Sequence, residues 1–143
     1  MTTVSTGVHA RLAWRETFSV GVQEIDEQHQ HLIAMLNQVA DLAERGRDDG
    51  RLAAILIRLV RYTEVHFALE ERLMRLHCYP SAVAHIGQHQ ALIRKVLDFR
   101  NHLRNGGPAL ISELLLFLTQ WLERHILGSD RRLGAFLRES GIA

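Results

Sequence analysis

The sequence has a single cysteine and, among its 143 residues, only two prolines. Cys78 has no second cysteine with which to form an internal disulfide bond, and such cysteine usage is typical of a reducing compartment, so we expect a cytoplasmic protein. Residues 1–14 contain no apolar segment of the kind found in a secretory signal, which agrees with that expectation.

An excess of charge and a long apolar run are also missing. The formal net charge is +1 and the two signs are interspersed, so there is no electrostatic reason to expect binding to nucleic acid or to an anionic membrane. The most apolar stretch, residues 109–122, is interrupted by Glu113 and by other polar side chains. We therefore expect no insertion into a membrane.

What is present favours helices. Leucine, alanine, arginine and glutamate are abundant, and the alternation typical of strands is missing. Apolar residues at three- and four-residue spacing predict four helices, over about residues 25–43, 52–74, 82–103 and 111–125. Turn signals separate them at residues 45–50, 79–80 and 105–108. Because the connections are short, we predict an all-α fold, an up-down-up-down antiparallel four-helix bundle.

The length suits one domain over residues 1–143, which we expect to be a monomer. Within it we predict an extended N-terminal arm over residues 1–20, the bundle over about residues 22–127, and a C-terminal tail over residues 128–143. We expect Gly128-Ser129 to break the fourth helix. A short final helix over residues 130–139 is weakened as a prediction by Gly134 in its middle.

Seven polar residues lie on, or at the end of, the apolar stripes of these helices. They are His29, His66, Glu70, His85, His89, His125 and Asp130. One histidine of each helix lies about 18 or 19 residues from the adjoining turn, so an antiparallel bundle brings them to one height. Glu70 and His85 lie one turn away from that height, which gives two stacked layers of side chains. The set is large enough for two metal ions.

Each piece alone has an ordinary interpretation. A pair such as His66 and Glu70 is more often a surface pair, and a lone histidine on an apolar stripe is more often a hydrogen-bonded core residue. A regular α-helix would splay His125 and Asp130 by about 140°, so they converge only if the helix opens or ends between them. The joint pattern nevertheless favours a dinuclear metal site, with iron first and manganese or zinc second. We assign no metal to the other histidines.

The motifs resemble the hemerythrin family in its single-domain bacterial form, the bacteriohemerythrins. The matching stretches are Trp14…Phe18-Ser-Val-Gly-Val-x-x-Ile-Asp-x-Gln-His29, Tyr62-Thr-x-x-His66-Phe67-x-x-Glu70, His85-x-x-x-His89 and Trp121-Leu122-x-x-His125-Ile126-x-x-x-Asp130. They run from about residue 14 to residue 130. The resemblance implies two non-haem iron ions with an oxo or hydroxo bridge, one ion held by His85, His89 and His125, and the other by His29 and His66. Glu70 and Asp130 would bridge the two ions.

The same resemblance implies a function. The iron ion with two histidines would have an open position for dioxygen, lined by Leu32, Phe67, Trp121, Leu122 and Ile126. We expect reversible dioxygen binding, for storage, delivery or scavenging, and no enzymatic activity. Two alternatives stay open: an oxygen or redox sensor that acts through a protein partner, and a diiron oxidase or peroxidase-like enzyme.

Overall fold

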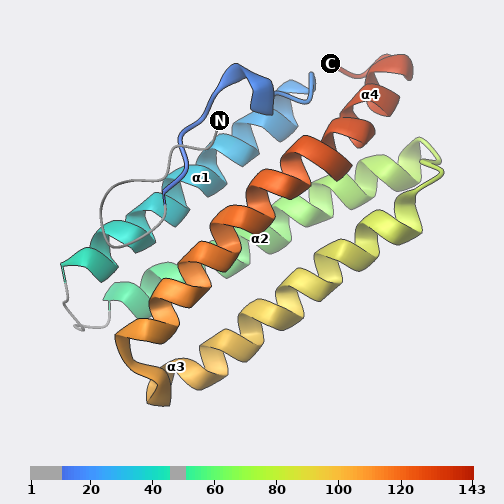
Figure 1. Cartoon of the computed structure of the whole chain (residues 1–143). Coiled ribbons are helices and arrows are strands. Elements are labelled where there is room, and N and C mark those ends of the chain that lie inside the picture. Colours follow the sequence, from blue (N-terminus) through green and yellow to red (C-terminus); the bar gives the residue numbers. More distant parts are fainter. Residues whose placement is uncertain (1–10, 46–50) are drawn as a thin grey trace.

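The computed structural model describes residues 11–45 and 51–143, without the side chains of residues 103–109. This part of the chain is helical and contains no strand. Its elements are η1 (Glu16–Phe18), α1 (Gln23–Glu44), α2 (Arg51–Leu76), α3 (Ala82–His125), η2 (Ile126–Asp130) and α4 (Arg131–Glu139), which are shown in Figure 1. None of these helices is long and apolar enough to cross a bilayer.

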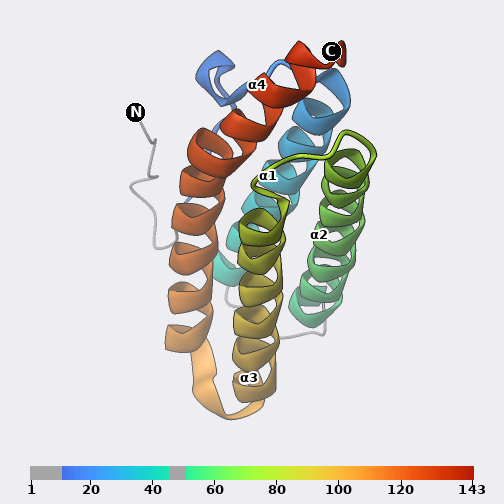
Figure 2. The ribbon, with the colours of Figure 1, turned by 90° about the vertical axis from the view of Figure 1, so that its right-hand side faces the viewer.

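The longest element, α3, contributes two helices to the bundle. It is assigned as helix from Ala82 to His125, yet Nε2 of His89 lies 3.2 Å from Nε2 of His125. A straight helix would separate these residues by about 54 Å, so α3 reverses direction between them. Figures 1 and 2 show the reversal, and we call residues 82–102 and 110–125 its first and second limbs. The turn predicted at residues 105–108 falls where side chains lie outside the described residues.

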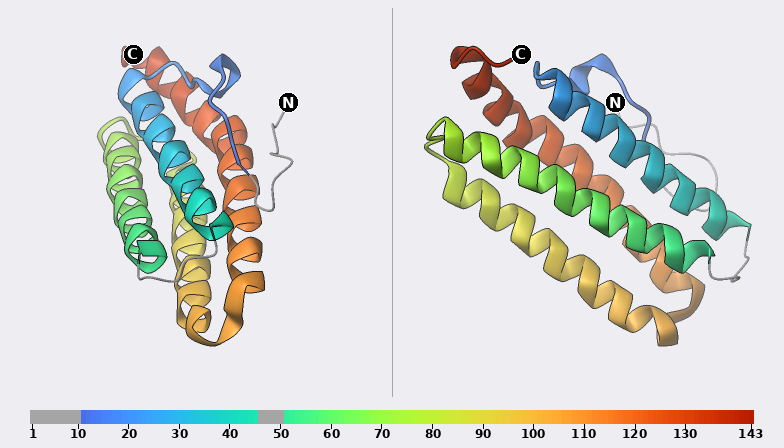
Figure 3. Two further views of the ribbon diagram at one scale, coloured as in Figure 1. Left: turned by 90° about the vertical axis from the view of Figure 1, so that its left-hand side faces the viewer. Right: turned by 180° about the vertical axis from the view of Figure 1, so that it is seen from behind.

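Helices α1 and α2 and the two limbs of α3 run antiparallel and side by side (Figure 3). The predicted all-α, up-down-up-down four-helix bundle is therefore confirmed. The first predicted turn, at residues 45–50, lies almost wholly outside the described residues. The second is confirmed, because α2 ends at Leu76 and α3 begins at Ala82, just beyond Pro80.

Two apolar clusters fill the bundle on either side of a layer of buried polar side chains. One includes Leu36, Leu59 and Leu114, and the other includes Ile25 and Met74. Each fully buried side chain of this size stabilises the fold by about 1.5–3 kcal/mol relative to an exposed one. The buried histidine and carboxylate side chains gather between the clusters, in the middle of the bundle.

An N-terminal arm, residues 11–22 in the described chain, packs against α1 and α4. The Asp26 carboxylate accepts hydrogen bonds from the backbone N–H of Val20, at 2.8 Å, and from the hydroxyl of Ser19, at 2.5 Å. Further along, Nη2 of Arg131 donates to the carbonyl oxygen of Thr17 at 2.6 Å. These contacts fix the arm so that Phe18 is fully buried.

The end of the bundle differs from the prediction. The expected break at Gly128-Ser129 is wrong, because η2 is a π-helix that joins α3 to α4 without interruption. Helix α4 continues the direction of the second limb (Figure 1), so the chain after residue 128 extends the bundle instead of forming a separate tail. The predicted final helix is confirmed with a start at Arg131.

Gly134 allows α4 and the arm to come into contact. A Cβ atom at this position would lie 2.2 Å from the carbonyl oxygen of Val20 and 2.7 Å from its Cβ. Val20 is buried and its backbone N–H donates to Asp26, so these two atoms cannot move aside at little cost. Gly134 weakened the prediction of a final helix, but the close packing of α4 on Val20 requires a glycine at this position.

We expect Gly134→Ala to lower the free energy of unfolding by about 1–3 kcal/mol, as overpacking does in other cores. Gly87→Ala is the matched control, since a Cβ there meets nothing within 4 Å. It should raise the free energy of unfolding by about 0.5–1 kcal/mol, because alanine is the better helix former. Urea unfolding followed by circular dichroism measures both, and equal effects of the two changes would contradict this packing argument.

Candidate metal centre

The structure brings all seven predicted polar residues together between the two apolar clusters. Their origins are α1 for His29, α2 for His66 and Glu70, the first limb of α3 for His85 and His89, the second limb for His125, and the end of η2 for Asp130. All seven are buried, with exposed fractions of 6 % or less. Every segment of the bundle therefore contributes to one polar centre.

The π-helix explains how His125 and Asp130 converge. In a π-helix the backbone hydrogen bonds join residues five apart, so such residues lie on the same face. Nε2 of His125 is 3.1 Å from Oδ1 of Asp130. For these residues to converge, the helix has to open or to end between them, and it opens into a π-helix.

The seven side chains form two groups that share both carboxylates. One group consists of Glu70, His85, His89, His125 and Asp130, and the other of His29, His66, Glu70 and Asp130. Within each group the potential ligand atoms lie within 4.8 Å of one another. We call them the three-histidine group and the two-histidine group.

Glu70 directs one oxygen to each group. Its Oε2 lies 2.9 Å from Nε2 of His66 and 3.5 Å from Nε2 of His29. Its Oε1 lies 3.2 Å from Nε2 of His89 and 3.4 Å from Nε2 of His85. This arrangement suits a carboxylate that bridges two cations.

Asp130, at the end of η2, has the same arrangement as Glu70 on α2. Its Oδ2 lies 2.9 Å from Nε2 of His29, in the two-histidine group. Its Oδ1 lies 3.0 Å from Nε2 of His85 and 3.1 Å from Nε2 of His125, in the three-histidine group. Each of the two carboxylates thus places one oxygen near the two-histidine group and the other oxygen near the three-histidine group.

The imidazole nitrogens of the three-histidine group also converge. Nε2 of His125 lies 3.1 Å from Nε2 of His85 and 3.2 Å from Nε2 of His89. Two ligands at right angles around a divalent metal, each at about 2.1 Å, would be separated by about 3 Å. The spacing therefore fits nitrogen atoms on adjacent corners of a metal's coordination shell.

Several of these buried atoms have no hydrogen bond among the described residues. They are Nδ1 and Nε2 of His29, Nδ1 of His85, and both oxygens of Glu70 and of Asp130. Their neighbours lie close, but the directions are not those of hydrogen bonds. Each buried polar atom left in this way costs about 1–3 kcal/mol. A metal ion removes that cost for the atoms that point at it, so the donor set fits bound cations.

The electrostatics of the metal-free site are dominated by the two carboxylates. Burial alone would lower the pKa of His29, but the Asp130 and Glu70 carboxylates beside it raise that pKa to about 10. The same balance raises the pKa of His85 to about 9. Burial opposes ionisation of Glu70 and Asp130, yet the surrounding imidazoles hold the pKa of both carboxyl groups well below the usual range.

Two residues beyond the seven were missed by the sequence argument. Oε1 of Gln28 lies 2.7 Å from Nδ1 of His66, and Oε2 of Glu71 lies 3.0 Å from Nδ1 of His89. Both are adjacent in sequence to a predicted ligand, which is a weak signal, since such neighbours usually point elsewhere on a helix. They hold the ring nitrogens that face away from the centre.

A small apolar cavity lies on the side of the first apolar cluster. Its volume is about 40 Å³, and its lining includes Leu32, Phe67, Trp121 and Leu122, four of the five residues predicted for an oxygen pocket. The fifth, Ile126, is fully buried in the second cluster and does not line it. Phe67 joins the cavity to the centre, because its ring stacks on His89 at 3.7 Å between centroids.

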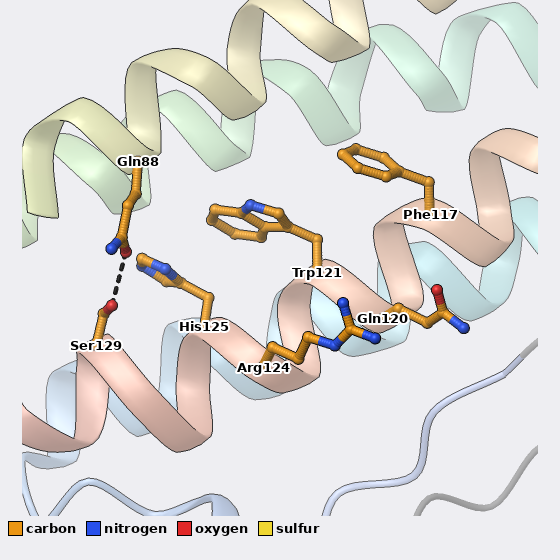
Figure 4. A pocket seen from close by; sticks show the side chains of 7 residues that line it. All are labelled: Gln88, Phe117, Gln120, Trp121, Arg124, His125 and Ser129. Carbon is orange, nitrogen blue, oxygen red and sulfur yellow. Dashed lines mark hydrogen bonds between the residues drawn. The ribbon is translucent and has the colours of Figure 1, made fainter.

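A larger and more polar pocket of about 280 Å³ reaches His125 from outside (Figure 4). It is lined by Gln88, Phe117, Gln120, Trp121, Arg124, His125 and Ser129. The Trp121 indole stacks on the His125 ring, at 4.4 Å and 14° between planes, and it also lines the apolar cavity. Trp121 is therefore the side chain that lies between the polar pocket and the apolar cavity.

Comparisons with known proteins agree with this geometry. The family model described as "Hemerythrin HHE cation binding domain" matches residues 20–137. The chain is 34 % identical over 122 residues to a bacteriohemerythrin of Stenotrophomonas maltophilia, and 36 % identical over 121 residues to one of Pseudomonas aeruginosa. Each match covers 85 % of this chain and 78 % of the relative.

Solved structures are similar as well. The crystal structure of a wild-type hemerythrin superposes with a TM-score of 0.81 at 26 % identity, over 90 % of this chain and 98 % of that one. The structure of a hemerythrin L114A mutant gives a TM-score of 0.80 at 25 % identity, over 88 % and 96 % of the two chains.

We expect metal uptake by the metal-free protein to release protons. His29 and His85, whose pKa values are about 10 and about 9, are protonated at neutral pH and must lose those protons to bind a metal. The apparent affinity for a divalent ion should therefore rise with pH up to about 9 or 10. An anaerobic titration with ferrous iron in weak buffer, read with a pH indicator, measures the release.

The same pKa values give the sign of the pH dependence of stability. Because both values are raised above the ordinary 6.5, the stability that these protonated histidines contribute is complete below that pH and is lost as the pH rises through about 9 and 10. The metal-free protein should unfold at lower urea concentration at about pH 10 than at about pH 6. Proton-neutral metal uptake, together with pH-independent unfolding, would contradict this description of the site.

Proposed function

The chain belongs to the hemerythrin family, and we propose that it binds dioxygen reversibly at a non-haem diiron centre, for storage, delivery or scavenging. The observation that carries the proposal is the pair of histidine groups, unequal in number, that share Glu70 and Asp130. The small apolar cavity beside that centre adds to it.

We assign one iron ion to each group. His85, His89 and His125 would hold the first ion, and His29 and His66 the second, with Glu70 and Asp130 on both. The first ion would then have five protein ligands and the second four. The two carboxylates would offset two of the four positive charges of two ferrous ions, which a dry core otherwise tolerates poorly.

Two iron ions held in this way would supply one electron each to bound dioxygen. The residues of the chain determine where that happens and what else can reach the site. The two-histidine group offers fewer ligand atoms, so a metal ion held there would have a position free for another ligand. Leu32 follows His29 by one turn of α1, and Phe67 follows His66 directly, so apolar side chains flank that group.

The apolar cavity would keep water and proton donors from the free position. Its lining is entirely apolar except for Thr63, whose hydroxyl donates to the carbonyl oxygen of Leu59 at 2.7 Å and is thereby occupied. Trp121 lies between this cavity and the polar pocket that contains Arg124. Reversible binding needs such exclusion, since protonation of reduced oxygen would release it and leave oxidised iron.

The ligand set also favours binding over oxidation of a substrate. Bundle diiron oxidases use a Glu-x-x-His spacing and are rich in carboxylates. Here the spacings are His66-x-x-x-Glu70 and His85-x-x-x-His89, and histidines outnumber carboxylates in the set. Fewer anionic ligands stabilise highly oxidised iron less. We further propose that the protein acts as a monomer in the cytoplasm, with dioxygen as its ligand.

The test is iron content together with an oxygen titration. We expect two iron ions per chain and reversible dioxygen uptake by the anaerobically reduced protein. Added oxygen should produce a visible charge-transfer band that disappears on purging with argon, and the cycle should repeat. One metal ion per chain, or mostly zinc after isolation from native cells, would contradict the diiron assignment. Irreversible oxidation with turnover of a reductant would favour the oxidase instead.

We expect Leu122→Asn to shorten the lifetime of the oxygenated form at least tenfold, because an amide in the apolar cavity admits water and a proton donor. Leu116→Asn is the matched control: it lies on the same limb of α3 but is 48 % exposed. The rate at which the visible spectrum changes to that of the oxidised protein measures both. If the two variants oxidise at the same rate, the cavity does not control the lifetime.

A further inference from the structure

The ring nitrogens that face away from the centre have different partners. His89 has a carboxylate, Glu71, at 3.0 Å from Nδ1, whereas His66 has the neutral amide oxygen of Gln28 at 2.7 Å. The corresponding atoms of His29 and His85 have no hydrogen bond among the described residues. An anionic partner on a histidine therefore occurs in the three-histidine group and not on His66.

We propose that Glu71 is a positioning residue that acts through His89 and lowers the reduction potential of the iron ion in the three-histidine group. The inference rests on the proposed diiron function, but it concerns a residue outside the seven. Glu71 does not belong to either group of potential ligands. It follows Glu70 on α2, and its carboxylate contacts Nδ1 of His89 on the first limb of α3.

The contacts of Glu71 support this role. Among the described residues, the Glu71 carboxylate makes one other ion pair, with Arg75 at a longer 3.6 Å, and that arginine side chain is 68 % exposed. The Glu71 side chain itself is 19 % exposed, so solvent screens its charge only in part. Its carboxylate is therefore available as the acceptor for the Nδ1 hydrogen of His89.

Phe67, also on α2, completes the restraint on His89. Its ring lies parallel to the imidazole, at 3.7 Å and 2° between planes. Stacking fixes the plane of the imidazole ring, and Glu71 fixes its orientation in that plane. Together they select the tautomer with the hydrogen on Nδ1, which leaves the Nε2 lone pair directed at the centre.

A charged acceptor does more than orient the ring. As the Nδ1–H bond polarises toward the carboxylate, electron density rises on Nε2 and makes it a stronger donor. A stronger donor stabilises ferric iron more than ferrous iron, so the reduction potential falls. The amide on His66 exerts the weaker effect of a neutral acceptor, and the two iron ions are thereby made unequal.

The test is a redox titration of iron-loaded Glu71→Gln, which keeps an oxygen acceptor but removes the charge. Because the proposal gives the iron ion of the three-histidine group the lower potential, that ion is reduced second. We expect the equilibrium constant for the second one-electron reduction step to rise about tenfold, equal to about 59 mV. Glu64→Gln is the matched control, because it removes the same charge from an exposed position on the same helix. It should leave the potential unchanged.

Gln28→Glu is an independent test, because it adds a negative charge next to Nδ1 of His66, and it should lower the potential of the first reduction step. If Glu71→Gln does not retain iron, the Gln28→Glu variant still tests whether a charge next to a ligand histidine changes the potential. An unchanged potential in a fully loaded Glu71→Gln, a shift as large in Glu64→Gln, or an unchanged potential in Gln28→Glu would each overturn the inference. Iron content and oxygen binding of the parent protein are measured separately, so failure of the proposed function is distinguishable from failure of this inference.

Discussion

The rest of the structure depends on the burial of two carboxylates between two histidine groups. Glu70 and Asp130 are 0 % and 1 % exposed, and each directs one oxygen to either group. Without a cation their oxygens have no hydrogen-bond donor among the described residues, and such burial is costly. The fold supports this arrangement with an apolar cluster on either side, so a cation bound between the carboxylates would stabilise the folded chain.

The connection between α3 and α4 shows how the backbone serves the centre. A regular α-helix would direct Asp130 away from His125, and a broken helix would lose the packing of α4 on the arm. The π-helix over Ile126–Asp130 satisfies both requirements, because it brings residues five apart to one face and continues into α4. Gly134 then lets α4 pack directly on Val20, which holds the end of η2 in place.

Helical periodicity and turn residues were sufficient to predict the bundle and to bring the seven polar residues to matched heights. They were not sufficient for the π-helix, because hydrogen bonds between residues five apart leave no composition signal, and Gly128-Ser129 suggested a break. The family resemblance implied that Ile126 lines the oxygen pocket, but this residue packs in the opposite cluster. Glu71 was missed because its role depends on a contact with another helix, at His89.

We propose that Glu70 and Asp130 each bind both of two metal ions. The most direct measurement is a crystal structure of the iron-loaded protein with anomalous scattering recorded at the iron edge. We expect two iron peaks about 3.5 Å apart, one among His85, His89 and His125 and the other between His29 and His66, with one oxygen of each carboxylate bound to each ion. A single peak, or two peaks with either carboxylate bound to one ion only, would contradict it.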